Sequence, residues 1–102
     1  MPEALLAIDV ETLHRVGRAL ADPIRRRILL ELLDGPAYPA VLADRLGTTR
    51  ANLSNHLSCL RECGLVSATA EGRHVRYDYA DARLGDALRL LGSLRLVGSC
   101  AT

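Results

Sequence analysis

The stretch Pro39–Leu65, PAVLADRLGTTRANLSNHLSCLRECGL, decides the fold. Its apolar spacing predicts a short helix over about residues 39–46 and a longer one over about residues 49–63. Gly47 lies just past the first helix, where a left-handed glycine is common, and Gly64 ends the second. Two helices joined by a tight turn that contains glycine form a helix-turn-helix. Residues 39–65 therefore predict a helix-turn-helix.

The sequence before this stretch predicts two more helices. Residues 2–20 carry a broad apolar stripe at helical spacing and predict one continuous helix. Asp22-Pro23 predicts a restart, because Asp is a favoured N-cap and Pro fits the first helical position. In the helix that follows, which Asp34-Gly35-Pro36 ends, Ile28 is expected to face inward and Arg25–Arg27 largely outward.

After the stretch, the sequence changes to the alternation that is typical of strands. Residues 65–70 and 73–79, separated by Glu71-Gly72, predict a tight β-hairpin. Asp81 is expected to cap a last helix with leucines on one stripe. The order α-α-α-α-β-β-α predicts a single winged helix-turn-helix domain over residues 1–102, mainly α with a β-hairpin wing.

Composition narrows the function classes. The net charge is only +1, but all 13 basic residues are Arg and none is Lys. Arginine binds phosphates and guanine edges as a two-pronged fork, although a GC-rich genome would also favour Arg codons. No apolar run approaches the roughly 20 residues that span a bilayer, and the N-terminus does not have the pattern of a secretory signal. We therefore expect a soluble, cytoplasmic protein with no membrane association.

The outward side of the 49–63 helix is small and polar, which suits the floor of a DNA major groove. Recognition helices of this motif contact base edges with their N-terminal residues, and the basic hairpin adds phosphate contacts. A solvated surface explains each residue singly as well, but the combination favours DNA binding. The candidate DNA-binding residues are Thr49, Arg50, Ala51, Ser54, Asn55, His56, Ser58, Arg73, His74 and Arg76.

The cysteines form a second candidate site. Cys59 and Cys63 lie four residues apart, hence one turn apart on one side of the same helix, and Cys100 is the third cysteine. An odd count without an export signal argues against a disulfide framework. The thiols can fill space between helices, switch by oxidation or persulfide formation, or bind a soft metal ion as thiolates. Spacing alone leaves these three alternatives open.

Two other function classes have less support. A thiol enzyme is not expected, because the chain has no Cys-x-x-Cys spacing, no βαβ pattern and no set of nucleophile, base and orienting group. A bare dimeric interaction module is the other alternative. Affinity for a palindromic operator, with its salt dependence, would separate both from a DNA-binding repressor.

Three segments, LADPIRRRILLELL, LSNHLSCLRECGLV and EGRHVRY, closely resemble the ArsR/SmtB family of winged-helix metal-responsive repressors. The similarity runs in unbroken order over roughly residues 13–94. It implies a homodimer through the first and last helices, over residues 1–20 and 81–97, with residues 39–63 as the helix-turn-helix and 65–79 as the wing. It also implies binding to operator DNA with an inverted repeat, and release when an inducer binds.

Within that family the chain resembles in particular the cadmium- and lead-sensing CmtR subgroup. The resemblance places recognition-helix thiols on Cys59 and Cys63, and a third thiol, from the C-terminal region of the other subunit, on Cys100. It implies Cd(II) or Pb(II) as inducer. Sensing of As(III) or Hg(II), or of thiol oxidation or persulfide through the same cysteines, is the alternative. The last helix contains no His, so a zinc- or nickel-type site there is disfavoured.

Overall fold

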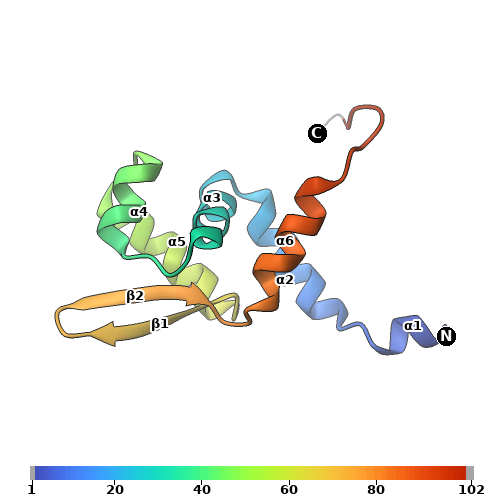
Figure 1. The fold of residues 1–102 in the computed structure, drawn as a ribbon, viewed down its shortest axis with the longest axis horizontal. Helices are drawn as coiled ribbons and strands as arrows, with labels where there is room; N and C mark the ends of the chain where they lie inside the picture. The colour runs from blue at the N-terminus through green and yellow to red at the C-terminus, as the bar shows by residue number, and fades with distance from the viewer. Residues whose placement is uncertain (1, 101–102) are drawn as a thin grey trace.

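The computed structural model describes residues 2–100, which fold into helices and one antiparallel hairpin (Figure 1). In Figure 1, α3 lies in the middle of the molecule, with α4 and α5 on one side and α2 and α6 on the other. The elements in chain order are α1 (Glu3–Leu6), α2 (Val10–Ala21), α3 (Pro23–Glu31), the 3₁₀ turn η1 (Leu32–Asp34), α4 (Pro39–Leu46), α5 (Arg50–Glu62), β1 (Val66–Glu71), β2 (His74–Tyr79) and α6 (Arg83–Ser93).

The predicted continuous helix over residues 2–20 is wrong, because the chain breaks between α1 and α2. Asp9 causes the break. Its backbone is extended, and its carboxylate accepts hydrogen bonds from the Glu11 amide and the Thr12 hydroxyl, both at 3.0 Å. A residue in this conformation caps a new helix and does not continue the old one. Five α-helices, not four, therefore precede the hairpin in the described chain.

The predicted restart at Asp22-Pro23 is confirmed. The Asp22 carboxylate accepts the Arg25 amide at 2.9 Å, and Pro23 occupies the first turn of α3. The helix tightens into η1 and ends at Gly35, whose φ of 118° lies in the region that favours glycine.

The helix-turn-helix is confirmed with the predicted limits. Gly47 ends α4 with a left-handed φ of 64°. Thr49, not Thr48, caps α5, and its hydroxyl accepts the Asn52 amide at 3.0 Å. Gly64, with φ 77°, then turns the chain out of α5 and into the wing.

The wing is a two-stranded antiparallel hairpin, as predicted. Glu71 pairs with His74, so the turn is Gly72-Arg73, one residue later than the predicted Glu71-Gly72. At the other end, the backbones of Ala37 and Tyr77 exchange two hydrogen bonds, at 2.9 and 2.8 Å. This bridge fixes the hairpin to the loop before α4.

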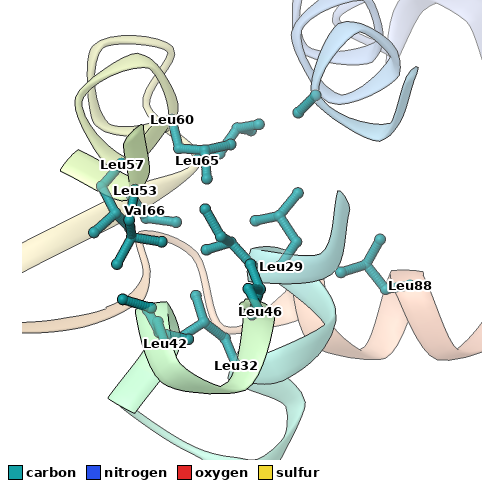
Figure 2. Packing of buried hydrophobic residues seen from close by; sticks show 13 residues of the cluster. Leu29, Leu32, Leu42, Leu46, Leu53, Leu57, Leu60, Leu65, Val66 and Leu88 are labelled. Atoms are coloured by element: carbon teal, nitrogen blue, oxygen red, sulfur yellow. The ribbon is translucent and has the colours of Figure 1, made fainter. Parts of the chain in front are cut away.

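One apolar core holds the helix-turn-helix and the base of the wing together (Figure 2). Tyr79 packs at the edge of this core, and the Tyr79 hydroxyl donates to the Leu29 carbonyl at 2.5 Å. Partial burial raises the pKa of Tyr79 to about 12. The largest fully buried side chains are Ile28, Leu29, Leu32, Leu42, Leu53, Leu57 and Leu60.

The last helix is shorter than the predicted 81–97. The residue before α6 is Ala82, not the predicted cap Asp81, although Asp81 accepts the Arg83 amide at 3.0 Å from one position earlier; α6 ends at Ser93. Leu94 is extended, and beyond it Leu96 and Val97 are 85% and 103% exposed. Among residues 2–100, no helix is long and apolar enough to cross a membrane.

Candidate DNA-reading helix and thiol site

One side of α5 belongs to the core and the other is open. Leu53, Leu57 and Leu60 are at most 1% exposed and pack against α3, α4 and β1. The open side carries the predicted groove-facing residues, all of which are exposed: Arg50, Ala51, Ser54, Asn55 and Ser58. The buried leucines thus fix which side chains α5 presents outward.

A shallow hollow of about 410 Å³ lies between the start of α5 and the wing. Arg50, Ala51 and Ser54 line it from α5, and Tyr77 lines it from β2. The first turns of the reading helix and the hairpin therefore share one concave surface.

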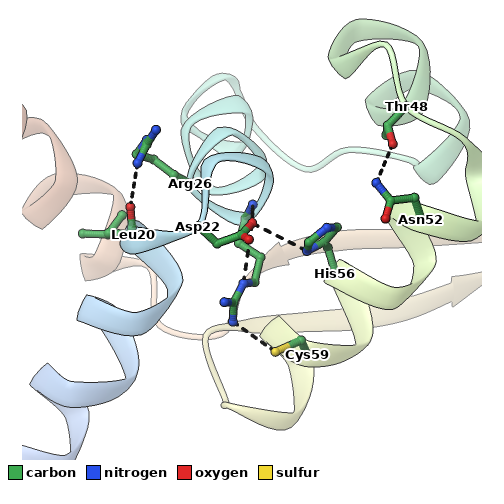
Figure 3. A network of polar contacts seen from close by, with 8 residues as sticks. Leu20, Asp22, Arg26, Thr48, Asn52, His56 and Cys59 are labelled. Atoms are coloured by element: carbon green, nitrogen blue, oxygen red, sulfur yellow. Dashed lines mark hydrogen bonds and ion pairs between the residues drawn. The ribbon is translucent and has the colours of Figure 1, made fainter. Parts of the chain in front are cut away.

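Two threonines organise the N-terminus of α5. Thr49 uses its hydroxyl to cap the helix, as described above. Thr48 accepts a 2.7 Å hydrogen bond from the side-chain amide of Asn52, which Figure 3 shows. Asn52 had no predicted role, although its spacing from Thr48 places the two residues on one helical stripe. Together these hydrogen bonds fix the start of α5.

The basic residues of the wing are in different environments. Arg73 is exposed in the turn, and His74 lies edge-on to the Tyr38 ring at 6.1 Å between centroids. Arg76 pairs with Glu71 at 3.3 Å. Tyr38 donates to the same carboxylate at 2.6 Å, and this hydrogen bond raises the pKa of Tyr38. Glu71 was expected only as a turn residue and Tyr38 had no predicted role, yet they offset part of the wing's charge and tie the wing to the start of α4.

His56 does not share the surface of the other predicted DNA-binding residues. Its side chain is 22% exposed, and its Nδ1 lies 3.7 Å from the Asp22 carboxylate at the start of α3 (Figure 3). His56 therefore points at the neighbouring helix.

Cys59, in α5, and Cys63, the C-cap residue of α5, are both half-buried. Cys59 Sγ accepts a hydrogen bond from Arg25 Nη1 at 3.2 Å. Cys63 packs against the core, and its carbonyl accepts from Arg15 Nη1 at 3.4 Å. Cys100 is exposed in the segment that follows α6.

The three cysteines do not form a closed site in one copy of the chain. Within residues 2–100, no three His, Cys, Asp or Glu side chains gather closely enough to hold a metal ion. The α5 pair alone supplies two sulfurs one turn apart, a donor set that suits a soft or borderline metal ion and not a hard one.

The contact between Arg25 and Cys59 was not predicted, because Arg25 was expected on the outer side of its helix. Arg25 lies three and four residues before Ile28 and Leu29, both fully buried. That spacing puts it on the inner stripe of α3, and the periodicity could have shown this.

Comparison with known proteins gives a consistent result. The model of the family described as "Bacterial regulatory protein, arsR family" matches residues 22–68. The transcriptional regulator CmtR of Mycobacterium tuberculosis is 67% identical over 76 residues, which are 74% of this chain and 64% of that protein. The match thus spans slightly less than two thirds of the relative's length.

Solved structures share the fold. The NMR structure of the cadmium sensor CmtR from Mycobacterium tuberculosis is 56% identical, with a TM-score of 0.68 over 87% of this chain and 97% of that one. A homodimeric winged helix-turn-helix DNA-binding domain from Mycobacterium bovis is 29% identical, with a TM-score of 0.73 over 91% and 89% of the two chains. The winged helix-turn-helix architecture is therefore established.

Proposed function

This chain belongs to the ArsR family of bacterial regulatory proteins, and from that premise we propose that it is a metal-responsive transcriptional repressor. It binds operator DNA as a homodimer and is released when Cd(II) or Pb(II) binds Cys59, Cys63 and Cys100. One observation carries the proposal: a single helix, α5, presents exposed polar residues on one side and two half-buried thiols on another.

In the DNA complex, the first turns of α5 enter the major groove. Ser54 and Asn55 read base edges, and Arg50 reaches a guanine or a phosphate. The wing follows the backbone with Arg73 foremost, because Arg76 is already paired with Glu71. Of the other predicted contacts, Thr49, Ala51 and Ser58 lie on or beside this surface, whereas His74 and His56 support it from Tyr38 and Asp22.

A dimer follows from the apolar surface that one copy leaves open. A groove of about 510 Å³ runs between α2 and α6, lined by Leu13, Val16, Leu84 and Leu91 among others. Leu13 and Leu91 are 60% and 53% exposed. Exposed apolar surface of this extent is typical of interaction sites, and the related domain from Mycobacterium bovis is homodimeric. A two-fold dimer reads an operator with two-fold symmetry, hence an inverted repeat.

The dimer also supplies the missing sulfur. Cys100 is exposed in the segment that follows α6, and α6 borders the proposed interface. Cys100 of one copy can then complete the pair Cys59 and Cys63 of the other, which gives three thiolates for a thiophilic ion. The relative from Mycobacterium tuberculosis is described as a cadmium sensor.

Release from DNA follows from the position of the sulfurs. Cys59 lies in the helix that contacts bases and Cys63 caps its end, so tying both thiols to the partner's tail restrains how that helix can sit in a groove. A ligand that favours the arrangement unable to bind DNA shifts the population by its difference in affinity. Operator DNA must weaken metal binding by the same factor.

The test measures operator binding by fluorescence anisotropy under reducing conditions, with and without Cd(II). The wild type is expected to release DNA when Cd(II) is added. Cys59→Ser and Cys63→Ser are expected to bind DNA normally and stay bound. Cys100→Ser is expected to bind DNA normally and need more Cd(II) for release. Normal release by the Cys59 and Cys63 variants would contradict the proposed site.

Titrations with Pb(II), Hg(II) and As(III) form parallel arms of the same experiment. Release at lower concentration of Hg(II) or As(III) than of Cd(II) or Pb(II) would favour the alternative inducers. Release by an oxidant or a persulfide donor in the absence of metal would favour thiol chemistry at the same cysteines.

A further inference from the structure

We propose that Arg25 is a positioning residue of the thiolate site: its guanidinium orients Cys59 Sγ and offsets part of the negative charge of the metal-loaded cluster. This inference rests on the proposed metal site and assigns a role to a residue of α3, the helix that packs against α5.

The geometry fixes the guanidinium from two directions. Arg25 Nη1 donates to Cys59 Sγ at 3.2 Å, and Arg25 Nε lies 3.8 Å from the Asp22 carboxylate. That carboxylate also accepts the Arg25 amide at 2.9 Å as the cap of α3. The side chain is only 18% exposed. Its charged end is therefore held in place before any ion arrives.

The contact between Arg25 and Cys59 also bears on the charge of the metal-loaded site. A divalent ion with three thiolates has a net charge of −1, and the Arg25 guanidinium, although it also faces Asp22, places a positive charge directly against one of these sulfurs. An unbalanced charge in a half-buried site is costly, and groups that donate to ligand atoms orient them and raise metal affinity. Arginine suits this role because its planar fork donates in fixed directions and keeps its positive charge.

The same contact links the sulfur to the rest of α3. Asp22 lies 3.7 Å from His56 Nδ1, and His56 precedes Cys59 by three residues on α5. Figure 3 shows Asp22, His56 and Cys59 across the gap between α3 and α5. One carboxylate thus lies beside His56 and is connected to Cys59 through Arg25. A rearrangement at Cys59 Sγ reaches the cap of α3 by this route.

The Cys63 thiol can be compared with the Cys59 thiol, because the two differ in their hydrogen bonds. In the described part of the chain, its Sγ accepts no hydrogen bond from a side chain, whereas Cys59 Sγ accepts one from Arg25. The proposal therefore predicts that loss of the guanidinium acts through Cys59 and not through the site in general.

The experiment measures Cd(II) affinity by competition with a chromophoric chelator, together with the sulfur-to-cadmium charge-transfer band. Arg25→Gln is expected to bind Cd(II) at least tenfold more weakly, as for other groups that support a metal ligand. Arg25→Lys is expected to recover part of the affinity, because it restores the charge without the fork. The matched control is Arg26→Gln, whose guanidinium donates to the Leu20 carbonyl and to no sulfur. It is expected to match the wild type.

A double-mutant cycle separates a role at the sulfur from a general effect on folding. In a Cys59→Ser background, Arg25→Gln is expected to have no further effect on the residual Cd(II) affinity. An equal loss in both backgrounds, or wild-type affinity of Arg25→Gln, would overturn the role of Arg25. Failure of the wild type to bind Cd(II) would instead overturn the proposed function.

Discussion

Tyr79 shows how much a single side chain contributes to the joint between wing and core. Its ring packs at the core edge, and its hydroxyl donates to the Leu29 carbonyl of α3. Loss of such a bond leaves a carbonyl without its partner and costs about 1–3 kcal/mol. The last residue of β2 therefore joins the wing directly to α3.

The charge state of Tyr79 gives a test of this joint at alkaline pH. Its pKa is raised to about 12 in the folded protein, against 10.0 for a free tyrosine. The stabilising effect is thus fully present below pH 10 and is lost as the pH rises towards 12. The urea midpoint of the wild type is expected to fall more between pH 9 and pH 11.5 than that of Tyr79→Phe.

The amino-acid composition limits how many other groups change charge in this pH range. All 13 basic side chains are arginines, which keep their charge across this range. Tyr38 and Tyr77 are present in both proteins, so their effects cancel in the difference. Equal slopes for the two proteins would show that the Tyr79 hydroxyl does not stabilise the fold.

At the scale of elements, α6 meets the core through a glycine. A Cβ at Gly85 would lie 3.0 Å from Tyr79 Cε2 and 3.7 Å from Leu33 Cδ2. The Tyr79 ring is held by its hydrogen bond and cannot give way easily. Gly92, on the same helix, has no atom within 4 Å of such a Cβ. In α6, therefore, Gly85 has close neighbours and Gly92 has none.

Alanine at the two sites is expected to have opposite effects. Alanine in place of glycine favours a helix by about 1 kcal/mol. Gly92→Ala is expected to gain part of this, whereas Gly85→Ala is expected to lose stability, because the steric contact outweighs the gain. Chemical denaturation of both variants checks the signs. A stabilised Gly85→Ala would mean that α6 does not pack closely against the wing.

The elements also show what the sequence could predict. Asp22-Pro23, Gly47 and Gly64 act locally, because backbone conformation and capping depend on the nearest residues, and all three boundaries were confirmed. The break at Asp9 is local as well, but the apolar stripe on both sides of it hid the cap. Arg25 and Cys59 are 34 residues apart, and only the packing of α3 on α5 brings them together.

At the scale of the whole molecule, one copy of the chain leaves its second apolar surface uncovered. The core fills the space around α3, α4 and α5, while the groove between α2 and α6 faces outward. Dimerisation through this groove would bury Leu13 and Leu91, each more than half exposed in a single copy.

A charge in this groove is expected to break the proposed dimer. Leu91→Glu places a carboxylate among apolar side chains, where an unpaired charge is costly. Sedimentation velocity is expected to show a monomer, and operator affinity is expected to fall, because each copy then binds a single half-site. Leu30→Glu, at an exposed position of α3, serves as the control and is expected to remain dimeric. A dimeric Leu91→Glu variant would place the interface elsewhere.

The division of α5 into separate surfaces has a practical consequence for sensor design. Ser54 and Asn55 lie on the open side, while Cys59 is turned towards α3. Under the proposed function, the DNA sequence that is bound and the ion that is sensed depend on different side chains of the same helix, α5. An engineer can then exchange the exposed residues to address a new promoter while the same ion still switches the reporter.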